Sequence, residues 1–511
     1  MLTCFFSGCM ALPKQDLTAS YALPANQAAS TSTAKELERL LSQQPAHLSG
    51  IYPLIEADEA FAARMLMARH AERSLDIQYY IWRADMTGLM LLEAVHEAAD
   101  RGVRVRLLLD DNNSAGLEPF LLAMDAHPNI EVRLFNPFVV RKPRWLGFVT
   151  DFKRVNRRMH NKSFTADSAV TIVGGRNIGD AYFGAADDEL FADLDVLTVG
   201  AVVPEVSADF DRYWNSSSAY GLSAIVKANG DVSLPRLAQR AEDIARNPAA
   251  QIYLESLRES DLIADLFHQR IEFKWAKVRI VSDEPDKVLG AENKEKMLLS
   301  QLQEIIGNPR HEVELVSPYF VPTKTGVAAF AWLSRKGVSV KVLTNSLAAT
   351  DVAAVHSGYG KRRKALLKAG VELYELRHVQ PKTKKEKKAE KKARKGRLLG
   401  SSGSSLHAKT FSVDAKHVFV GSFNFDPRSA LLNTELGFVI DSPELAERIS
   451  RAFREEIPQQ AYQVKLDKKG RLYWLERQGE QVIIHAKEPT AKLSRRVSAY
   501  LLSWLPIDSL L

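Results

Sequence analysis

The chain has 511 residues, a length that suits about three average domains or a duplicated pair of larger ones, and its 46% hydrophobic content is ample for a sizeable core. The formal net charge is +7, but the segment 382–397 alone carries ten Lys or Arg and two Glu. The rest of the chain is therefore close to neutral, which excludes overall charge as an argument for nucleic-acid binding.

The amino-terminal stretch holds the chain's two cysteines, Cys4 and Cys9, so a disulfide framework or a cysteine metal site in the body is excluded. Phe6–Cys9 reads FSGC and resembles a bacterial lipobox, which makes Cys9 a candidate for lipidation. The stretch departs from that pattern in its first residue and lacks a basic leader region. Two interpretations stay open, a lipid-anchored protein or an accidental likeness. No later run reaches the ~20 apolar residues of a membrane span.

The first half of the chain predicts a strand–helix–strand unit. SLDIQYYIW (Ser74–Trp82) is rich in β-branched and aromatic residues, as strands are. Thr87–Gly102 follows with helical spacing of its apolar residues and a glycine at its end. Val103–Asp111 and Ile130–Pro137 then predict two further strands. This order is typical of a mostly parallel sheet covered by helices.

The second half repeats the unit. Val313–Val321 predicts a strand, Gly326–Gly337 a helix, and Val338–Ser346 and Val371–Leu376 two more strands. We therefore expect an α/β protein with two similar lobes. The predicted organisation has a leader and flexible tether, a first lobe, a connecting helical segment, a second lobe with a lysine-rich loop (380–400), and a carboxy-terminal extension with an amphipathic segment. In the same order these parts are 1–45, 46–233, 234–285, 286–460 and 461–511.

A short motif occurs once in each half. Met159 begins MHNKSFTADSAVTIVGGRN, and Leu406 begins LHAKTFSVDAKHVFVGSFN. Residues two apart on a strand point to the same side, so His160 projects with Lys162, and likewise His407 with Lys409. Asn177 and Asn424 close the two motifs, and their amides can donate hydrogen bonds to an anion.

The remaining motif positions predict supporting roles. Asp167 and Asp414 fall where each strand turns, which favours a structural role over a catalytic one. Small residues allow close backbone approach to a phosphate, and they are Gly174, Gly175, Gly421 and Ser422. Each histidine also needs an acid that orients it, and the candidates after the motifs are Asp193, Asp195 and Glu435.

One imidazole cannot both attack and protonate, but two facing halves can do both. Two lysines and two asparagines would then surround a single charged group, most naturally a phosphodiester whose negative charge spreads over its oxygens during displacement. This chemistry needs no carboxylate cluster, so we expect neither a metal nor another cofactor.

The doubled pattern His-x-Lys, four residues, Asp, six residues, Gly-x-x-Asn resembles the signature of the phospholipase D superfamily. The resemblance implies two α/β/α lobes packed face to face with pseudo-two-fold symmetry and one active site at their seam. It also implies a covalent phosphohistidine at the first-motif histidine, His160, with His407 as general acid and then general base.

Within the superfamily, Val173–Phe183 and Gly421–Ile440 resemble the cardiolipin synthase branch, most closely its C-type. This resemblance implies phosphatidyl transfer from phosphatidylethanolamine or phosphatidylglycerol to phosphatidylglycerol, with phospholipids and a membrane surface as expected partners. The sequence leaves open whether an accessory protein is also a partner. It also implies a bacterial, membrane-associated protein, facing the periplasm if Cys9 carries lipid. A phospholipase D-type hydrolase is the alternative, and a nuclease is a less favoured one.

Two further stretches favour lipid over nucleic acid. Phe138, Trp145 and Phe148 alternate with basic residues, which suits a headgroup interface and also suits stacking on single-stranded nucleic acid. Lys492–Leu505 places its large apolar residues on one helical face beside basic ones. That face suits either the membrane interface or docking on the protein body, and both interpretations stay open.

Overall fold

The structure is a computed structural model, and it describes residues 12–15, 17–114, 116–186, 190–227, 233–258, 271–291, 293–378, 405–505 and 507–511. Cys9 and the lysine-rich loop 380–400 lie outside these residues, so what was expected of them stays a prediction.

The first lobe is built on a mixed sheet. Its strands are β1 (Ser49–Leu54), β2 (Ser74–Ile81), β3 (Arg104–Asn113), β4 (Ile130–Phe135), β5 (Ser163–Ala166), β6 (Val170–Gly174), β8 (Asp195–Gly200) and β9 (Ala219–Gly221). They lie in the order β1-β8-β6-β5-β2-β3-β4-β9. β2, β3 and β4 are parallel, and the other neighbours are antiparallel.

The second lobe repeats this sheet. Its strands are β10 (Lys274–Ser282), β11 (Glu312–Val316), β12 (Ser339–Asn345), β13 (Glu372–Leu376), β15 (Thr410–Val413), β16 (His417–Gly421), β17 (Leu436–Asp441) and β18 (Ala461–Leu466). Their order, β10-β17-β16-β15-β11-β12-β13-β18, matches that of the first lobe position by position. β19 (Leu472–Gln478) and β20 (Gln481–His485) extend the sheet beyond β18.

The two lobes join where β1 pairs antiparallel with β10, with Gly50 opposite Trp275. These strands hold the same position in their lobes, so their pairing marks the pseudo-two-fold axis and unites one eighteen-stranded sheet in the described part of the chain. The predicted connector over 234–285 is therefore wrong in its last part, because residues 274–282 form a central strand. Lys274, Lys277 and Arg279 interrupt the apolar run of this strand, KWAKVRIVS.

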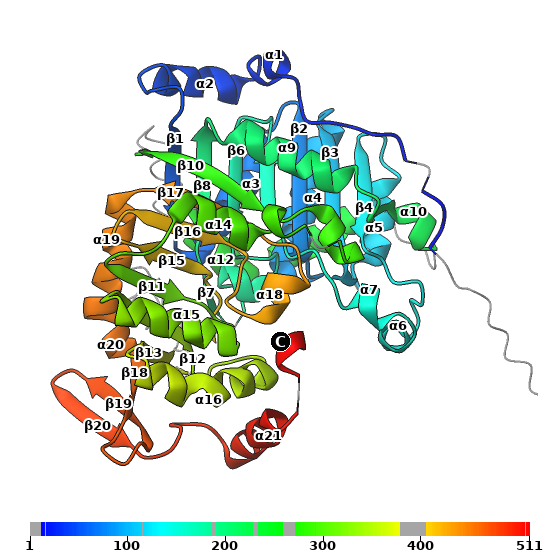
Figure 1. The fold of residues 1–511 in the computed structure, drawn as a ribbon. Helices are drawn as coiled ribbons and strands as arrows, with labels where there is room; N and C mark the ends of the chain where they lie inside the picture. Colours follow the sequence, from blue (N-terminus) through cyan, green and yellow to red (C-terminus); the bar gives the residue numbers. More distant parts are fainter. Residues whose placement is uncertain are drawn as a thin grey trace, which may run out of the picture.

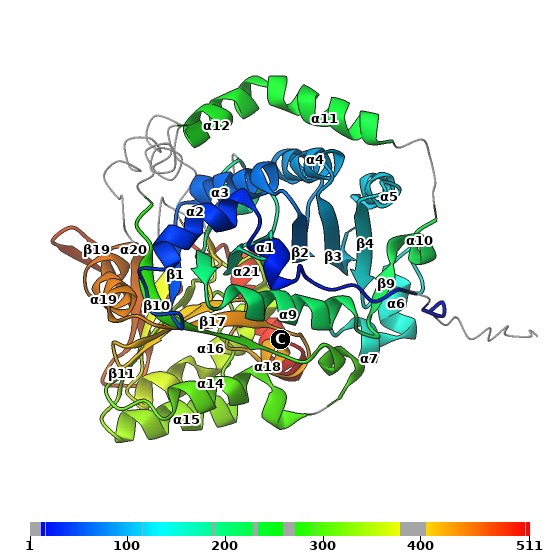
Figure 2. The same ribbon diagram turned by 90° about the horizontal axis from the view of Figure 1, so that it is seen from above.

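Helices cover both faces of each half of the sheet (Figures 1 and 2). In the first lobe α3 (Ala57–His70), α4 (Met86–Asp100) and α5 (Glu118–Asp125) lie on one face and α9 (Val203–Trp214) on the other. α11 (Leu234–Arg246) and α12 (Pro248–Arg258) form an outer layer over α4 and α3. The second lobe has α14 (Leu298–Ile306), α15 (Lys324–Arg335) and α16 (Ala353–Lys368), with α19 (Pro443–Arg451) against the opposite face.

The equivalent helices α4 and α15 begin in the same way. The Asp85 side chain accepts the backbone N–H of Gly88, and the Thr323 hydroxyl accepts that of Gly326. Such caps satisfy one of the N–H groups that the first turn of a helix leaves unpaired. The sequence thus fixes the same helix start in both halves.

Three apolar clusters form the core. One lies inside each lobe, around Phe61 in the first and Phe419 in the second. The third lies at the seam and draws side chains from both lobes, including Val196 and Phe438. A core shared in this way holds the two halves of the sheet together. The expected fold class, two similar α/β lobes, is confirmed.

The remaining elements are shorter or peripheral. They are α1 (Ala25–Ala28), α2 (Ser32–Leu41), α6 (Trp145–Thr150), α7 (Phe152–Val155), α8 (Asp180–Phe183), β7 (Phe191–Ala192), α10 (Leu222–Ile225), β14 (Ser405–Leu406), α18 (Pro427–Leu431), α20 (Ile457–Gln460) and α21 (Leu493–Ser503). Among the residues that the structure describes, none of the helices combines the length and apolarity needed to cross a bilayer.

Candidate active site

The two motif histidines lie at equivalent places beside the seam. His160 lies just ahead of β5, and its backbone N–H donates to the Thr434 carbonyl of the second lobe at 2.9 Å. His407 lies just ahead of β15, and its N–H donates to the Ala192 carbonyl of the first lobe at 2.8 Å. Each motif is thus attached by its backbone to the other lobe.

Each imidazole is also held by a carboxylate from the other lobe. His160 Nδ1 lies 2.8 Å from Glu435 Oε2, and His407 Nδ1 lies 2.5 Å from Asp193 Oδ2. All four side chains are buried. A carboxylate that accepts the Nδ1 proton leaves the Nε2 lone pair of a neutral imidazole available for chemistry.

The two lysines fold back onto their own motifs. Lys162 Nζ donates to the His160 carbonyl at 2.6 Å, and Lys409 Nζ donates to the His407 carbonyl. Lys409 Nζ also lies 2.8 Å from His407 Nδ1. Both ammonium groups are buried at the seam.

Burial and mutual repulsion set the protonation of this cluster. Burial lowers the pKa of His160 to about 4. The charge of Glu435 raises this pKa, and the charges of Lys162 and Lys409 lower it. Burial, followed by the charge of Lys409, also lowers the pKa of His407. Burial lowers the pKa of Lys162 to about 7 and that of Lys409 to about 8.

The two orienting carboxylates are ionised in this environment. Burial alone would raise their pKa values, but neighbouring cations reverse the effect. His160 and Lys162 lower the pKa of Glu435, and Lys409 and His407 lower that of Asp193. At neutral pH the cluster therefore holds two carboxylates beside two neutral imidazoles.

Both motif asparagines, Asn177 and Asn424, are buried. Asn177 Oδ1 accepts the backbone N–H of Ile81 at 3.2 Å, and its Nδ2 has no hydrogen-bond partner among the described residues. Asn424 is fixed through its backbone N–H, which donates to Ser429 Oγ. An amide N–H₂ without a protein partner is suited to an oxyanion.

The motif aspartates lie away from the histidines, at left-handed turn positions with φ of 54° at Asp167 and 53° at Asp414. Asp167 accepts the backbone N–H groups that lead into β2, from Glu72 to Ser74. Asp414 does the same for residues 310–312 ahead of β11. These bonds tie the turn to the neighbouring strand, which is a structural arrangement.

The small residues of the two loops make room for acids. A Cβ built on Gly175 would lie 2.1 Å from Asp193 Oδ1, and one on Gly174 would lie 2.1 Å from Asp195 Oδ1. A Cβ on Gly421 would lie 2.4 Å from the Leu436 carbonyl. The close approach that the structure shows at these positions is to the following strand and, at Gly174 and Gly175, to its carboxylates. Their expected approach to a phosphate stays a prediction.

Ser422 takes the place of Gly175 in the second motif. Its hydroxyl donates to Glu435 Oε2 at 2.5 Å, so the oxygen that holds His160 has a second donor. Ser422 also accepts the backbone N–H of Leu436. Its role in the structure is to fix Glu435, a role that the sequence did not suggest.

Of the two aspartates left open after the first motif, Asp195 does not contact a histidine. It pairs with Arg64 at 2.8 Å and with Arg176 at 3.4 Å, all within the first lobe. Gly437 pairs with Gly421 as Asp195 pairs with Gly174, so the second lobe has no carboxylate at this position. Asp195 is therefore not an orienting acid in this structure.

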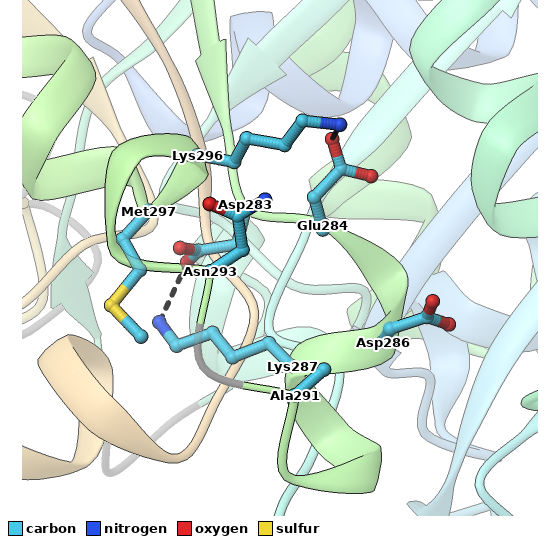
Figure 3. A pocket seen from close by; sticks show the side chains of 8 residues that line it. All are labelled: Asp283, Glu284, Asp286, Lys287, Ala291, Asn293, Lys296 and Met297. Carbon is cyan, nitrogen blue, oxygen red and sulfur yellow. Dashed lines mark hydrogen bonds and ion pairs between the residues drawn. The ribbon is translucent and has the colours of Figure 1, made fainter.

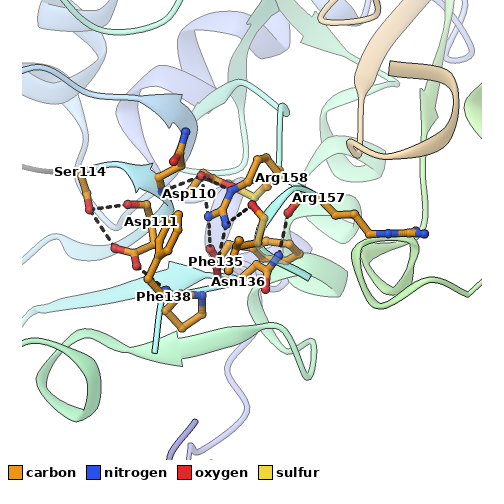
Figure 4. A network of polar contacts seen from close by, with 12 residues as sticks. Asp110, Asp111, Ser114, Phe135, Asn136, Phe138, Arg157 and Arg158 are labelled. Atoms are coloured by element: carbon orange, nitrogen blue, oxygen red, sulfur yellow. Dashed lines mark hydrogen bonds and ion pairs between the residues drawn. The ribbon is translucent and has the colours of Figure 1, made fainter. Parts of the chain in front are cut away.

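A polar network supports the backbone before His160 (Figure 4). Asp110 accepts the Met159 N–H at 2.8 Å and pairs with Arg158. Arg141 and Arg144 are engaged by Asp111. These two arginines are thus not free cations of a headgroup interface.

The aromatic part of that expected interface is also wrong in two of its three residues. Phe138 is buried, and Phe148 packs against it with ring centroids 5.4 Å apart. Only Trp145 is exposed. The aromatic and basic residues that alternate in the sequence separate in the structure. Phe138 and Phe148 pack against each other, and Arg141 and Arg144 form ion pairs.

A buried ion pair that sequence reasoning missed joins Asp283 and Lys287 (Figure 3). Asp283 accepts the Glu435 backbone N–H at 3.0 Å and the Lys287 ammonium at 2.9 Å. Lys287 also donates to the Ser429 carbonyl, one residue of the helix that fixes Asn424. The pair lines a small cavity of about 220 Å³ and ties Glu435 and the Asn424 loop to the end of β10.

Aromatic side chains border the imidazoles. Tyr80 lies edge-on to His160, with ring centroids 4.9 Å apart, and Tyr182 lies edge-on to His407 at 5.2 Å. The Tyr319 hydroxyl donates to the exposed Asp351 carboxylate at 2.7 Å. The charge of Asp351 contributes to raising the pKa of Lys409 and of Tyr182.

The geometry allows nucleophilic displacement at phosphorus with a second imidazole for proton transfer. Within the described residues, no group of three or more His, Cys, Asp or Glu side chains is arranged to hold a metal ion. Two α/β lobes with a doubled His-Lys-Asn site at their seam define a protein of the phospholipase D class.

Comparison with known proteins identifies the family. The family model described as "Cardiolipin synthase, PLD-like domain" matches residues 66–214 and 302–457. The chain is 49% identical over 475 residues to cardiolipin synthase C of Escherichia coli, covering 92% of this chain and 98% of that one. It is also 30% identical to an uncharacterised protein of Helicobacter pylori over 94% of this chain and 93% of that one.

A solved structure shares the fold. The phosphatidylserine synthase of Haemophilus influenzae superposes with a TM-score of 0.56 and 14% identity, covering 93% of this chain and 99% of that one. The chain belongs to the cardiolipin synthase family of phospholipase D-like proteins. It is a phosphatidyltransferase of that superfamily and acts on phospholipids, as the sequence predicted.

Proposed function

We propose that the protein transfers a phosphatidyl group to phosphatidylglycerol through a phosphohistidine at His160. The observation that supports this most directly is the crossed pairing of His160 with Glu435 and of His407 with Asp193. It provides two neutral imidazoles with different proton partners beside one charged cluster.

In the first step His160 Nε2 attacks phosphorus and the P–O bond to the donor's head alcohol breaks. His407, which takes up a proton once the anionic phosphodiester is bound, supplies that proton to the leaving oxygen. In the second step the primary hydroxyl of phosphatidylglycerol gives its proton to His407 and its oxygen attacks phosphorus, which releases His160. His407 ends protonated again, so the cycle balances. Lys162, Lys409 and the Asn177 amide stabilise the charge that develops on the non-bridging oxygens.

The donor is phosphatidylethanolamine or phosphatidylglycerol. Asp351 favours the former, because its exposed carboxylate, whose charge acts on Lys409, would attract the ammonium of an ethanolamine headgroup. The name of the Escherichia coli relative, cardiolipin synthase C, agrees with phosphatidylglycerol as the acceptor. Hydrolysis is the same reaction with water as the acceptor, so transfer requires that the seam exclude water during the second step.

The protein would work at a bacterial membrane, with its lobes in the periplasm if Cys9 is lipidated. Nucleic acid is not among its proposed partners, whereas an accessory protein is.

The test incubates labelled phosphatidylglycerol with the protein, with and without phosphatidylethanolamine, and in parallel with EDTA. Labelled cardiolipin is expected when phosphatidylethanolamine is present, with or without EDTA, and its yield without phosphatidylethanolamine shows whether phosphatidylglycerol also serves as donor. His160→Ala and His407→Ala should both abolish it while the proteins stay folded. Phosphatidic acid as sole product would establish the hydrolase instead. Cleavage of single-stranded DNA without any lipid product would refute the proposal, and loss of activity in EDTA with rescue by Mg²⁺ would refute its metal-free mechanism.

A further inference from the structure

The helix α21 is amphipathic, but it presents its apolar face outward. Its large apolar side chains form one stripe, made of Leu493, Val497, Tyr500, Leu501 and Trp504. Leu493 and Trp504 are each 74% exposed. The small side chain of Ala499, on the opposite face, is the one that packs against the body, beside Leu347 and Ala491.

The basic side chains of α21 serve its attachment. Arg495 donates to the Thr350 carbonyl and Arg496 to the Glu488 carbonyl, and both are partly buried. The apolar face of a surface helix normally lies against the protein and its charged face in solvent. In α21 the orientation of the two faces is the opposite. The second of the two interpretations left open by the sequence, a helix that docks on the protein body through its apolar stripe, is wrong for this structure.

A second exposed apolar group lies on the short helices α6 and α7. Trp145 and Val149 are one helical turn apart and are 63% and 71% exposed, while Phe148 turns inward to Phe138. Phe152 at the start of α7 is also exposed. Lys142 and Lys153 flank this group and are exposed to solvent.

The two apolar groups border the same part of the seam. The end of the chain runs from α21 to Arg428 of α18, whose guanidinium donates to the Leu510 carbonyl and to Asn156, the residue after α7. Asn156 precedes His160 by four residues, and Arg428 follows Asn424 by four. In Figure 1, α18 and the carboxy terminus lie between α7 and α21.

We propose that α21 together with α6 and α7 forms a membrane-docking surface that lies in the headgroup layer of an anionic bilayer. Its apolar side chains would enter the acyl boundary on both sides of the active-site seam. Lys142, Lys153 and Lys492 would meet lipid phosphates, which is the charge complementarity that favours a lipid surface over an apolar protein face.

This inference goes beyond the proposed reaction, because it concerns the surface by which the protein binds a bilayer rather than the group that it transfers. A surface of this kind would present the seam to headgroups without removing the lipid from the bilayer. Burying each large side chain should change vesicle partitioning by roughly tenfold or more.

The experiment measures co-sedimentation of the full chain with vesicles of phosphatidylethanolamine and phosphatidylglycerol. Every sample carries Cys9→Ser, so that acylation cannot bring the protein to the vesicles. The variants are Leu501→Glu with Trp504→Glu, and Trp145→Glu with Val149→Glu. Trp332→Glu, at a tryptophan 42% exposed on α15, is the matched control.

Each double variant is expected to lose vesicle binding by at least tenfold, while the control and His160→Ala bind like the unsubstituted chain. Circular dichroism verifies that each variant is folded. Unchanged binding of both double variants would overturn the proposal and leave the stripe as a contact for a protein partner. An equal loss in the Trp332 control would overturn it as well. Because His160→Ala is inactive under the proposed function, its binding separates the two proposals.

Discussion

The substitution Glu435→Gln removes the charge that crosses the seam to His160 while keeping the shape of the side chain. Glu435 Oε2 accepts the His160 Nδ1–H at 2.8 Å, and both groups are buried. Glutamine retains an oxygen that can accept this bond. Its N–H₂ group can also turn to Nδ1, which would place the ring proton on Nε2 and occupy the attacking lone pair.

The magnitude follows from the charge that forms during the first step. An imidazole that attacks phosphorus through Nε2 and keeps its Nδ1 proton becomes cationic. Opposite unit charges 2.8 Å apart interact by roughly 6 kcal/mol at an effective dielectric constant of about 20. In the variant, the neutral hydrogen bond from His160 to the glutamine offsets about 1 kcal/mol of this loss. The variant also avoids the cost of burying a carboxylate, which offsets a further part. A net loss of about 3–5 kcal/mol remains, which lowers kcat by roughly 10²- to 10⁴-fold.

The assay follows cardiolipin formation from labelled phosphatidylglycerol between pH 6 and 8. Glu435 raises the pKa of His160, so the substitution lowers that pKa further below about 4. His160 stays neutral throughout the range, so its own titration adds no pH dependence to the loss, and KM should stay nearly unchanged. Glu435 also raises the pKa of Lys162 and Lys409, so the substitution should move the alkaline fall in activity to lower pH. Glu435→Asp, which keeps the charge, is the control and should retain more activity. A folded Glu435→Gln protein with kcat within tenfold of the unsubstituted enzyme would refute this account of the crossed carboxylate.

Three further predictions concern the same cluster. With a donor that carries an activated leaving group, His407→Ala should still accumulate a phosphatidyl adduct on His160, detected by mass spectrometry; an adduct on any other residue would contradict the assignment of the nucleophile. Because the pKa of Lys162 is lowered to about 7 and that of Lys409 to about 8, both lose their charge as pH rises, and kcat/KM should fall between pH 7 and 8. Lys162→Arg should move that fall to higher pH, and an unshifted profile would count against the lysines. Asp351→Asn should reduce use of phosphatidylethanolamine as donor several-fold more than use of phosphatidylglycerol, and an equal effect on both would show that Asp351 does not read the headgroup.

Much of the fold was accessible from the sequence because its signals are local. The strand–helix–strand units were predicted within a few residues, since apolar spacing and caps act over one element. The strand β10 was missed because its charged residues interrupt the apolar run. The docking of α21 also could not be predicted, because an apolar stripe does not say which side faces the protein.

The candidate site was predictable in its members but not in its pairings. The doubled motif gave the histidines, lysines and asparagines, because their spacing is short and repeated. The partners of the histidines lie 275 and 214 residues away in sequence, and no local pattern reports such a distance. Asp283 and Lys287 lie outside both motifs, and only the fold brings them behind Glu435.

The exchange of acids between the lobes makes the halves chemically dependent on each other. A lobe produced alone would have a histidine without the carboxylate that orients it, and a carboxylate without the histidine that it orients. Two separately expressed lobes should therefore be inactive until they are mixed. The dependence also constrains inheritance. The longer side chain of Glu435 lies against the Ser422 hydroxyl in the second lobe, whereas the shorter Asp193 lies against Gly175 in the first. A substitution of either acid therefore requires a compensating change at the histidine of the other lobe.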